Sequence, residues 1–327
     1  MKIKVPVCMI AILLILAACA PASTQQVANP EPIFTNTAES PETQVAETSA
    51  PATPTTRSTT RPSDTPTPWP SDVGSQSIGD TYYEMLGNGG YDVQKYTIRM
   101  DVDMKTGSME AVTQIEAVST QDLRVFSLDF TGLEWDSVRV NGVEAQFERR
   151  IRKLVITPTE PLEKDSPFTV EVAYHGTPWT VTSVSGGTVG WFRAMDGTIN
   201  IFTEPDGAYS WFPCNNHPRD KALYRFEITV DDPWVAAANG LLIETIPQDQ
   251  QKTTYVFELN EPMATYLATV HIDKFDLVTM TGPNNIQIRD YIPADFPQEK
   301  REILQLIPEI IEFYNGIFGP YPSTVYG

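Results

Sequence analysis

The three histidines are the first residues to consider for metal chemistry. Zinc-dependent hydrolysis on a helix requires the pattern H-E-x-x-H, which places two imidazoles on one helical face with a glutamate beside them. His175, His217 and His271 are followed by Gly, Pro and Ile, so none begins this pattern. They are also too far apart in the sequence to share a helical turn. We therefore expect no metal ligands and no catalytic residues in this chain, and we assign the histidines to solvated or turn positions.

The cysteines indicate export rather than redox chemistry. An apolar run, Val5 to Ala18, follows Lys2 and Lys4 and is too short to span a bilayer comfortably. It closes with Leu16-Ala17-Ala18-Cys19, which resembles the bacterial lipoprotein box, whose cysteine becomes the acylated first residue of the mature protein. We predict a lipoprotein signal peptide over residues 1–19 with lipidation at Cys19; an ordinary signal peptide with an incidental cysteine is the alternative. The mature protein is then an exported, membrane-anchored lipoprotein that faces the extracytoplasmic side, at the cell surface or in the periplasm.

Cys214 is the single ordinary thiol that remains after processing, because Cys8 leaves with the signal peptide. No internal disulfide can then form in the mature chain. A free cysteine usually packs as a small hydrophobe. We expect Cys214 to be buried.

The segment from Thr203 to Pro218 brings carboxylates, aromatic residues, a cysteine and a histidine close together. It reads T-E-P-D-G-A-Y-S-W-F-P-C-N-N-H-P and is followed by Asp220-Lys221-Ala222. It resembles the signature segment in the N-terminal domain of the aminopeptidase N family of zinc metallopeptidases, which includes leukotriene hydrolase. Other stretches fall in the family's order and extend the resemblance to about residues 90–327: Ser127-Leu128-Asp129, Val138-Arg139-Val140-Asn141-Gly142, Glu261-Pro262-Met263-Ala264-Thr265-Tyr266-Leu267 and Phe318-Gly319-Pro320-Tyr321-Pro322.

The resemblance implies a saddle-shaped β domain beside a thermolysin-like catalytic domain, and zinc as the cofactor of the full-length family member. It also implies that Glu204, which matches the Gln or Glu of the signature, holds the free α-amine of a peptide substrate. An α-ammonium has a pKa of about 8, and a fixed negative charge selects it. A turn carboxylate without this role is the alternative for Glu204.

The chain departs from the family pattern at three points. Tyr209 stands where the family usually has Arg, and Asn216 replaces the Asp of F-P-C-x-D. Neither position binds zinc or transfers a proton in the family. The third departure is the absence of both H-E-x-x-H and the family's G-x-M-E-N motif from all 327 residues. We therefore expect this chain alone to be inactive, as a fragment that ends before the catalytic motifs.

The residues between about 88 and 293 have the period-two alternation of half-buried strands. Apolar and polar residues alternate over 96–104, 168–175 and 224–230, and turn pairs such as Asn141-Gly142 and Asn239-Gly240 separate such runs. The pattern predicts a mostly β, antiparallel, saddle- or sandwich-like domain over residues 88–293. The aromatic residues of this range could form a sugar-stacking platform, but we assign them to the core: Trp179, Trp191, Phe192, Tyr209 and Trp211.

Two flanking segments differ from this domain. Residues 20–80 are rich in Pro, Thr and Ser with almost no apolar clustering, which predicts a disordered tether. Apolar residues return at helical spacing from about Pro297 to Phe318, with Pro308 expected to interrupt the helix. We interpret residues 294–327 as the start of the catalytic domain, with an apolar helical face that nothing later in this chain covers.

These observations predict the N-terminal, substrate-amine-recognising portion of a membrane-anchored zinc aminopeptidase that removes N-terminal residues from peptides. The expected partners are peptides, the membrane and a catalytic domain that packs on the β domain. A net charge of −19 without a basic stripe excludes a nucleic-acid-binding protein. The alternative is a surface lipoprotein whose β-sandwich only binds peptide or carbohydrate, or serves as an adhesive module.

Overall fold

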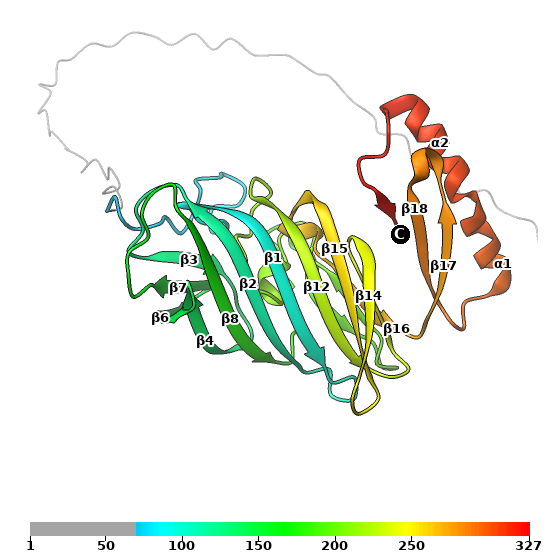
Figure 1. The fold of residues 1–327 in the computed structure, drawn as a ribbon, viewed down its shortest axis with the longest axis horizontal. Helices are drawn as coiled ribbons and strands as arrows, with labels where there is room; N and C mark the ends of the chain where they lie inside the picture. The colour runs from blue at the N-terminus through cyan, green and yellow to red at the C-terminus, as the bar shows by residue number, and fades with distance from the viewer. Residues whose placement is uncertain (1–69) are drawn as a thin grey trace, which may run out of the picture. The chain divides into compact units, whose positions relative to one another are not determined.

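The computed structural model describes residues 70–327 (Figure 1). The predicted signal peptide, Cys19 and most of the predicted tether lie outside these residues. The described part is built mainly of strands, which confirms the predicted mostly β fold class.

An eight-stranded sheet forms the largest element. Its order is β14 (Leu241–Gln248), β15 (Lys252–Ala264), β12 (Lys221–Asp231), β1 (Tyr91–Val102), β2 (Met109–Ser119), β8 (Pro167–Gly176), β4 (Glu134–Val140) and β5 (Val143–Glu144). Neighbouring strands are antiparallel except β1 and β12, which run parallel. Three of these strands, β1, β8 and β12, cover the runs predicted from alternation.

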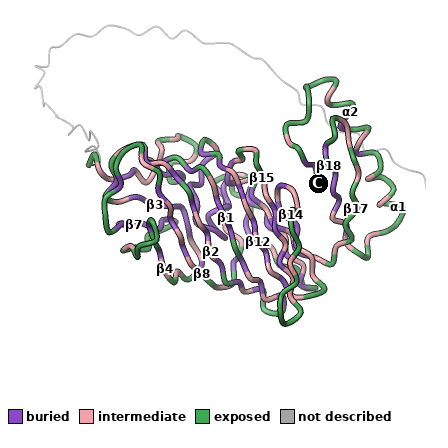
Figure 2. The backbone as a smooth tube through the Cα atoms, in the orientation of Figure 1, coloured by how far each residue is buried: buried purple, intermediate pink, exposed green. Residues whose placement is uncertain are grey.

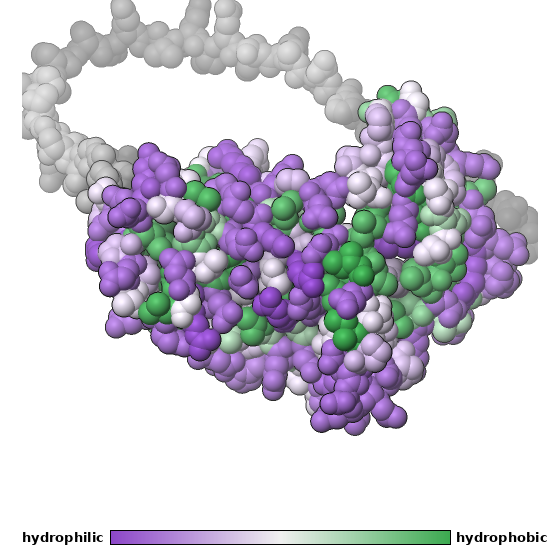
Figure 3. Space-filling view, viewed as in Figure 1, coloured by the Kyte–Doolittle hydropathy of each residue, from purple (hydrophilic) through white to green (hydrophobic). Residues whose placement is uncertain are grey.

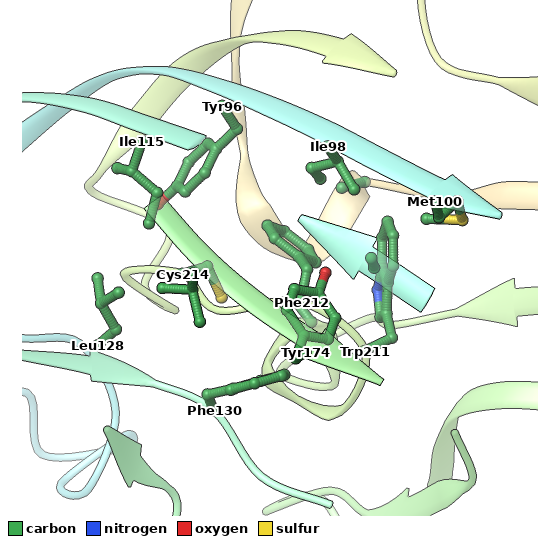
Figure 4. Close-up of a cluster of buried hydrophobic side chains, with 14 of the residues drawn as sticks. Tyr96, Ile98, Met100, Ile115, Leu128, Phe130, Tyr174, Trp211, Phe212 and Cys214 are labelled. Atoms are coloured by element: carbon green, nitrogen blue, oxygen red, sulfur yellow. The ribbon is translucent and has the colours of Figure 1, made fainter. Parts of the chain in front are cut away.

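Alternation sets which face of this sheet is buried. Tyr96, Ile98 and Met100 of β1 are buried in the core, while Arg99 is exposed. Buried and more exposed positions are interspersed along the strands of the large sheet (Figure 2). The same core contains Tyr174 of β8 and the side chains of Phe212 and Cys214 (Figure 4). On the visible surface, hydrophobic residues also gather near β14, where Ile243 is half-exposed (Figure 3).

Two smaller sheets share this core. One has the order β13 (Val235–Ala238), β16 (Val270–Asp273), β11 (Ile199–Phe202), β10 (Thr188–Arg193) and β9 (Thr180–Thr182). The other has the order β3 (Phe126–Asp129), β7 (Lys153–Thr157) and β6 (Gln146–Arg150). Ile201 and Ile272 of the first and Leu128 and Ile156 of the second belong to one apolar cluster with the large sheet. The sheets therefore cover opposite sides of a common core, as the sandwich prediction requires.

The prediction that Trp179 belongs to the core is wrong. Its side chain is 54% exposed, whereas Trp191, Tyr209 and Trp211 are buried. The indole lies against the backbone of Gly132, where a Cβ would come within 3.2 Å of the ring. A side chain at position 132 would therefore crowd the indole, which packs on this glycine at the surface and not in the core.

Residues 70–80 contact the β domain, although the sequence places them at the end of the tether. Val73 forms a parallel bridge with Val125, and the Gly74 amide donates to the Val125 carbonyl at 2.8 Å. Asp72 pairs with Arg124 at 2.9 Å. Main-chain hydrogen bonds of this kind leave no periodic trace in the sequence, so composition alone extended the predicted tether too far.

The C-terminal elements form a separate small sheet with helices beside it. β17 (Phe275–Thr281) pairs with β18 (Gln287–Pro293), and β18 pairs in parallel with β19 (Val325–Tyr326). The predicted boundary after residue 293 therefore divides strands that hydrogen-bond to each other. None of the helices between residues 70 and 327 has the length and hydropathy needed to cross a membrane.

The predicted C-terminal helix is interrupted, as expected from Pro308. It consists of α1 (Gln298–Arg301), a 3-10 segment η4 (Glu302–Leu306) and α2 (Ile307–Phe318), with Pro308 in the first turn of α2. Ile307 and Ile311 pack against Ile288 of β18 and against Ile286, which lies just before that strand. The apolar face predicted to be uncovered is thus partly covered within this chain, because β18 supplies a hydrophobic surface that lies earlier in the sequence.

Candidate functional site

The signature segment forms the loop between β11 and β12. It begins at Thr203, passes through the short 3-10 turn η1 (Ala208–Ser210) and ends before Lys221. Trp211, Phe212 and Cys214 are completely buried and anchor the loop to the core. Burial also raises the pKa of the Cys214 thiol well above its ordinary value. The predicted burial of Cys214 is confirmed.

A buried ion pair holds the middle of the loop. Cys214 and Asp129 exchange main-chain hydrogen bonds of 3.0 and 2.7 Å. The Asp129 carboxylate accepts hydrogen bonds from Lys153 Nζ at 2.7 Å and from the Asn216 amide at 2.9 Å. Burial raises the pKa of Asp129, while the Lys153 ammonium opposes that shift. A charge taken out of water is costly unless it is paired, so the Lys153 ammonium and the Asn216 backbone amide both stabilise the buried Asp129 carboxylate.

Asn216 joins the two ends of the loop. Its Nδ2 donates to the Asp206 carbonyl at 2.7 Å, and its Oδ1 accepts from Thr265 Oγ1 at 3.2 Å. An aspartate at this position could not donate to Asp206. The departure from the family pattern at Asn216 therefore comes with a hydrogen bond that an ionised carboxylate cannot donate.

Asn215 and Asp220 hold the end of the loop against the start of β1. Asn215 Oδ1 accepts from the Asn88 amide at 2.7 Å, and its Nδ2 donates to the Asp220 carboxylate. The other Asp220 oxygen accepts from the Val93 amide at 3.2 Å. Burial raises the pKa of Asp220 to about 7 in spite of these donors.

Glu204 is exposed and lies between Thr203 and Asp206, whose side chains are held by hydrogen bonds. Thr203 Oγ1 donates to the Tyr266 carbonyl at 2.6 Å, and Asp206 Oδ2 accepts from the Val184 amide at 3.0 Å. Both neighbours are buried, whereas the Glu204 side chain faces solvent. The backbone that carries Glu204 is therefore held from both sides while its carboxylate stays accessible.

Two residues that the sequence analysis did not select, Asp80 and Tyr83, lie near this turn. His217, which the sequence assigns to a turn, is buried there, with its Nε2 3.2 Å from Asp80 Oδ2 and its ring edge-on to Tyr83. Desolvation raises the pKa of the Tyr83 hydroxyl, and the nearby carboxylates of Asp206, Asp80 and Glu204 add to the shift. No local pattern marks these residues: Asp80 ends the predicted tether, and Tyr83 lies between the tether and the predicted β domain.

Tyr209 stands at the position of the family's usual Arg, and its ring contacts the guanidinium of Arg152. The Arg152 side chain comes from the turn between β6 and β7, and its Cζ lies 5.5 Å from the centre of the Tyr209 ring. A cation over an aromatic face is attracted by the ring's quadrupole. An arginine from elsewhere in the chain thus brings positive charge close to this position.

The other two histidines do not join the loop. His175 is exposed and its Nδ1 lies 2.9 Å from Asp136, which raises the pKa of the imidazole. His271 is more buried than its predicted polar-face position implies: it contacts Asn200 and Thr269, and burial lowers its pKa. Within residues 70–327, no three His, Cys, Asp or Glu side chains are grouped so that they could hold a metal ion.

The large sheet, the two smaller sheets and the loop between β11 and β12 make up one β domain with a common core. Residues 92–267, more than half of the chain, match the family model described as Peptidase M1 N-terminal domain. The chain therefore belongs to the M1 peptidase family through its N-terminal domain, which confirms the resemblance first seen in the signature segment.

Relatives and solved structures agree with this assignment. The chain is 28% identical over 231 residues to leucyl aminopeptidase from Saccharolobus solfataricus, covering 69% of this chain and 27% of that protein. It is 25% identical over 191 residues to glutamyl aminopeptidase from Sus scrofa, covering 55% of this chain and 20% of that protein. The chain thus spans about a quarter of the length of these relatives.

The M1 zinc metallopeptidase from Deinococcus radiodurans has a similar structure, with a TM-score of 0.71 and 25% identity over 77% of this chain and 59% of that chain. A mutant of that enzyme bound to a Tyr-Ser-Ala substrate matches equally well.

Proposed function

We propose that this chain is the substrate-amine-recognising portion of a zinc aminopeptidase that removes N-terminal residues from peptides. The observation that carries the proposal is the placement of Glu204, an exposed carboxylate on a turn where Thr203 and Asp206 are held by hydrogen bonds to other segments. Membership of the M1 family and the similarity to aminopeptidases support it.

The chemistry of the proposal is the selection of a free α-ammonium. A carboxylate forms a short, charge-assisted hydrogen bond with an ammonium, and a rigid support reduces the entropy lost on binding. Thr203 and Asp206 provide that support through main-chain partners in other elements. Glu204 would therefore align the substrate's N-terminus rather than take part in bond cleavage.

The zinc that the family implies does not fit the side chains of this region. Residues 70–327 offer no set of three ligands, and the 327 residues contain no H-E-x-x-H. No step of the hydrolysis is therefore assigned to this chain, and its proposed role is substrate binding. We propose that the chain by itself is inactive, and that the lipid on Cys19 holds it at the extracytoplasmic face of a membrane.

The amine-anchor role is tested in an expressed polypeptide that carries this chain together with a zinc-binding catalytic domain. Replacing Glu204 with Ala should lower kcat/KM for peptides with a free N-terminus by roughly 10- to 100-fold, because one charge-assisted hydrogen bond is lost. Substrates with a blocked N-terminus have no ammonium to lose and should be indifferent. Glu160→Ala, at an exposed loop position, is the matched control.

Comparing substrates with free and with blocked N-termini shows whether Glu204→Ala impairs amine binding or the fold of the protein. Equal losses for free and blocked substrates would show that Glu204 is structural. A loss confined to free N-termini, with Glu160→Ala unchanged, supports the proposal.

A further inference from the structure

Arg289 is a buried cation whose donors are only partly used. It lies in β18 and is 6% exposed, and its Nη2 donates to the Ala238 carbonyl at 2.7 Å. Its Nε and Nη1 are buried and have no hydrogen-bond partner among residues 70–327. Buried polar groups normally have partners, and a buried charge without a counter-charge is costly. These two nitrogens therefore point to an acceptor supplied from outside these residues.

The neighbours of Arg289 hold the guanidinium but do not neutralise it. Its Cζ lies 5.2 Å from the centre of the Phe257 ring and 5.6 Å from that of Tyr291. No carboxylate of residues 70–327 forms an ion pair with it. Asp290, the next residue in the strand, lines one cavity together with Arg289, but it is not among the hydrogen-bond partners of the guanidinium. The guanidinium thus lies between aromatic surfaces without an ion-pair partner among residues 70–327.

Arg289 lines two adjacent cavities of about 660 and 410 Å³, and Asn239 lines both of them as well. Lys221 adds a second cation to the larger cavity, whose one acidic side chain, Glu261, accepts a hydrogen bond from the Thr324 backbone amide at 3.1 Å. Tyr291 lines the smaller cavity, and its buried hydroxyl also has no partner among the described residues. The cavities therefore combine apolar walls with unused donors, the composition typical of small-molecule sites.

We propose that Arg289 is the recognition residue of a binding site for a small organic carboxylate. Nη2 carries two protons, and one of them is donated to the Ala238 carbonyl. The second Nη2 proton is parallel either to the N–H of Nε or to one N–H of Nη1, depending on which side of the guanidinium faces Ala238. Either pair offers the fork that the two oxygens of a carboxylate accept. The Tyr291 hydroxyl provides a further donor, and the aromatic walls suit a ligand with an apolar body.

The proposal is tested by titrating the purified chain with hippurate, an aromatic carboxylate, and with hippuramide, its uncharged amide. Calorimetry should show saturable binding of hippurate, and hippuramide should bind at least roughly 10-fold more weakly. Arg289→Met should weaken hippurate binding by roughly 10- to 100-fold. Arg289→Lys should give an intermediate affinity, because it keeps the charge but loses the planar fork. Lys300→Met, which removes an exposed cation from the neighbouring helix α1, should bind hippurate like the parent.

The comparison of hippurate with hippuramide on the parent protein keeps the test decisive even if Arg289→Met fails to fold. Equal affinities for the acid and the amide would overturn the proposal. So would a folded Arg289→Met variant that binds hippurate as tightly as the parent. A crystal structure with the hippurate carboxylate against the Arg289 guanidinium would support it directly, and one with the ligand elsewhere would refute it. None of these results depends on Glu204.

Discussion

At the scale of single residues, two neutral amide side chains make the buried hydrogen bonds that hold the loop between β11 and β12. Asn215 and Asn216 each donate and accept within the same buried network, and they link β1, the loop and the segment near Thr265. An amide can do both without carrying a charge, so it satisfies buried partners without the desolvation cost of an ion. Beside this network, the buried carboxylate of Asp129 is paired with the Lys153 ammonium.

Asp220 should make stability depend on pH. Its pKa is about 7 in the folded chain against an ordinary value of 3.8, because burial disfavours the charged form. The folded state therefore binds the proton more tightly than the unfolded state. The stabilisation from this group is complete below about pH 4 and is lost as the pH rises through about 7. Over that window it should reduce the free energy of unfolding by up to about 1.4 kcal/mol per pH unit.

Chemical denaturation of the parent and of Asp220→Asn at several pH values between 4 and 8 measures this contribution. The Asn variant should lose this part of the pH dependence, although it is expected to be less stable overall because Asn215 faces a changed acceptor. Asp249→Asn, at an exposed turn, serves as the control. Identical pH slopes in the parent and in Asp220→Asn would argue against a raised pKa at Asp220.

At the scale of elements, α2 has two unlike apolar surfaces. Ile307 and Ile311 are buried against the small sheet, while Ile310, Phe313 and Ile317 are about half-exposed. These contacts form a cluster separate from the core of the large sheet. The helix should therefore open as a local unit, independently of the β domain.

Ile311→Ala tests that independence. Removing a buried isoleucine side chain costs about 2–5 kcal/mol, which should lower hydrogen-exchange protection of residues 307–318 by roughly 30-fold or more. Protection of β1 and β12 should stay unchanged. Ile310→Ala, one position away on the exposed side, should have little effect. A loss of protection that extends to β1 would mean that α2 and the large sheet unfold together.

At the scale of the whole molecule, the prediction concerns the membrane. Residues 1–19 carry the charged start, the short apolar run and the Leu16-Ala17-Ala18-Cys19 box, and they lie outside the described structure. If Cys19 is acylated, several buried acyl chains at about 0.8 kcal/mol per CH₂ should hold the protein on the membrane. Fractionation of a bacterial host should therefore place the parent in the membrane fraction.

The two cysteines of the predicted signal peptide allow a test substitution at Cys19 and a control substitution at Cys8. Cys19→Ser should release the protein from the membrane fraction or block its processing, whereas Cys8→Ser should leave its distribution unchanged. Membrane association of Cys19→Ser as complete as that of the parent would show that lipid on Cys19 is not the anchor.

The sequence by itself determined the features that depend on neighbours along the chain. Period-two alternation predicted β1, β8 and β12, because the face that a strand residue occupies follows from its place in the run. Pro308 predicted the interruption before α2, because proline lacks the N–H that a helix interior needs. The order of residues from Thr203 to Pro218 identified the family and selected Glu204 as the candidate amine anchor.

Only the tertiary structure decided how these pieces meet. Asn88 and Asn215 are 127 positions apart, and Lys153 reaches Asp129 across 24, so no local pattern could pair them. The same holds for the parallel pairing of β1 with β12, and for Val73 beside Val125. Hydrogen bonds and buried charges are satisfied by whichever group the fold brings within about 3 Å. Periodicity reports only whether a residue is buried, and the partner that makes its burial possible is chosen in three dimensions.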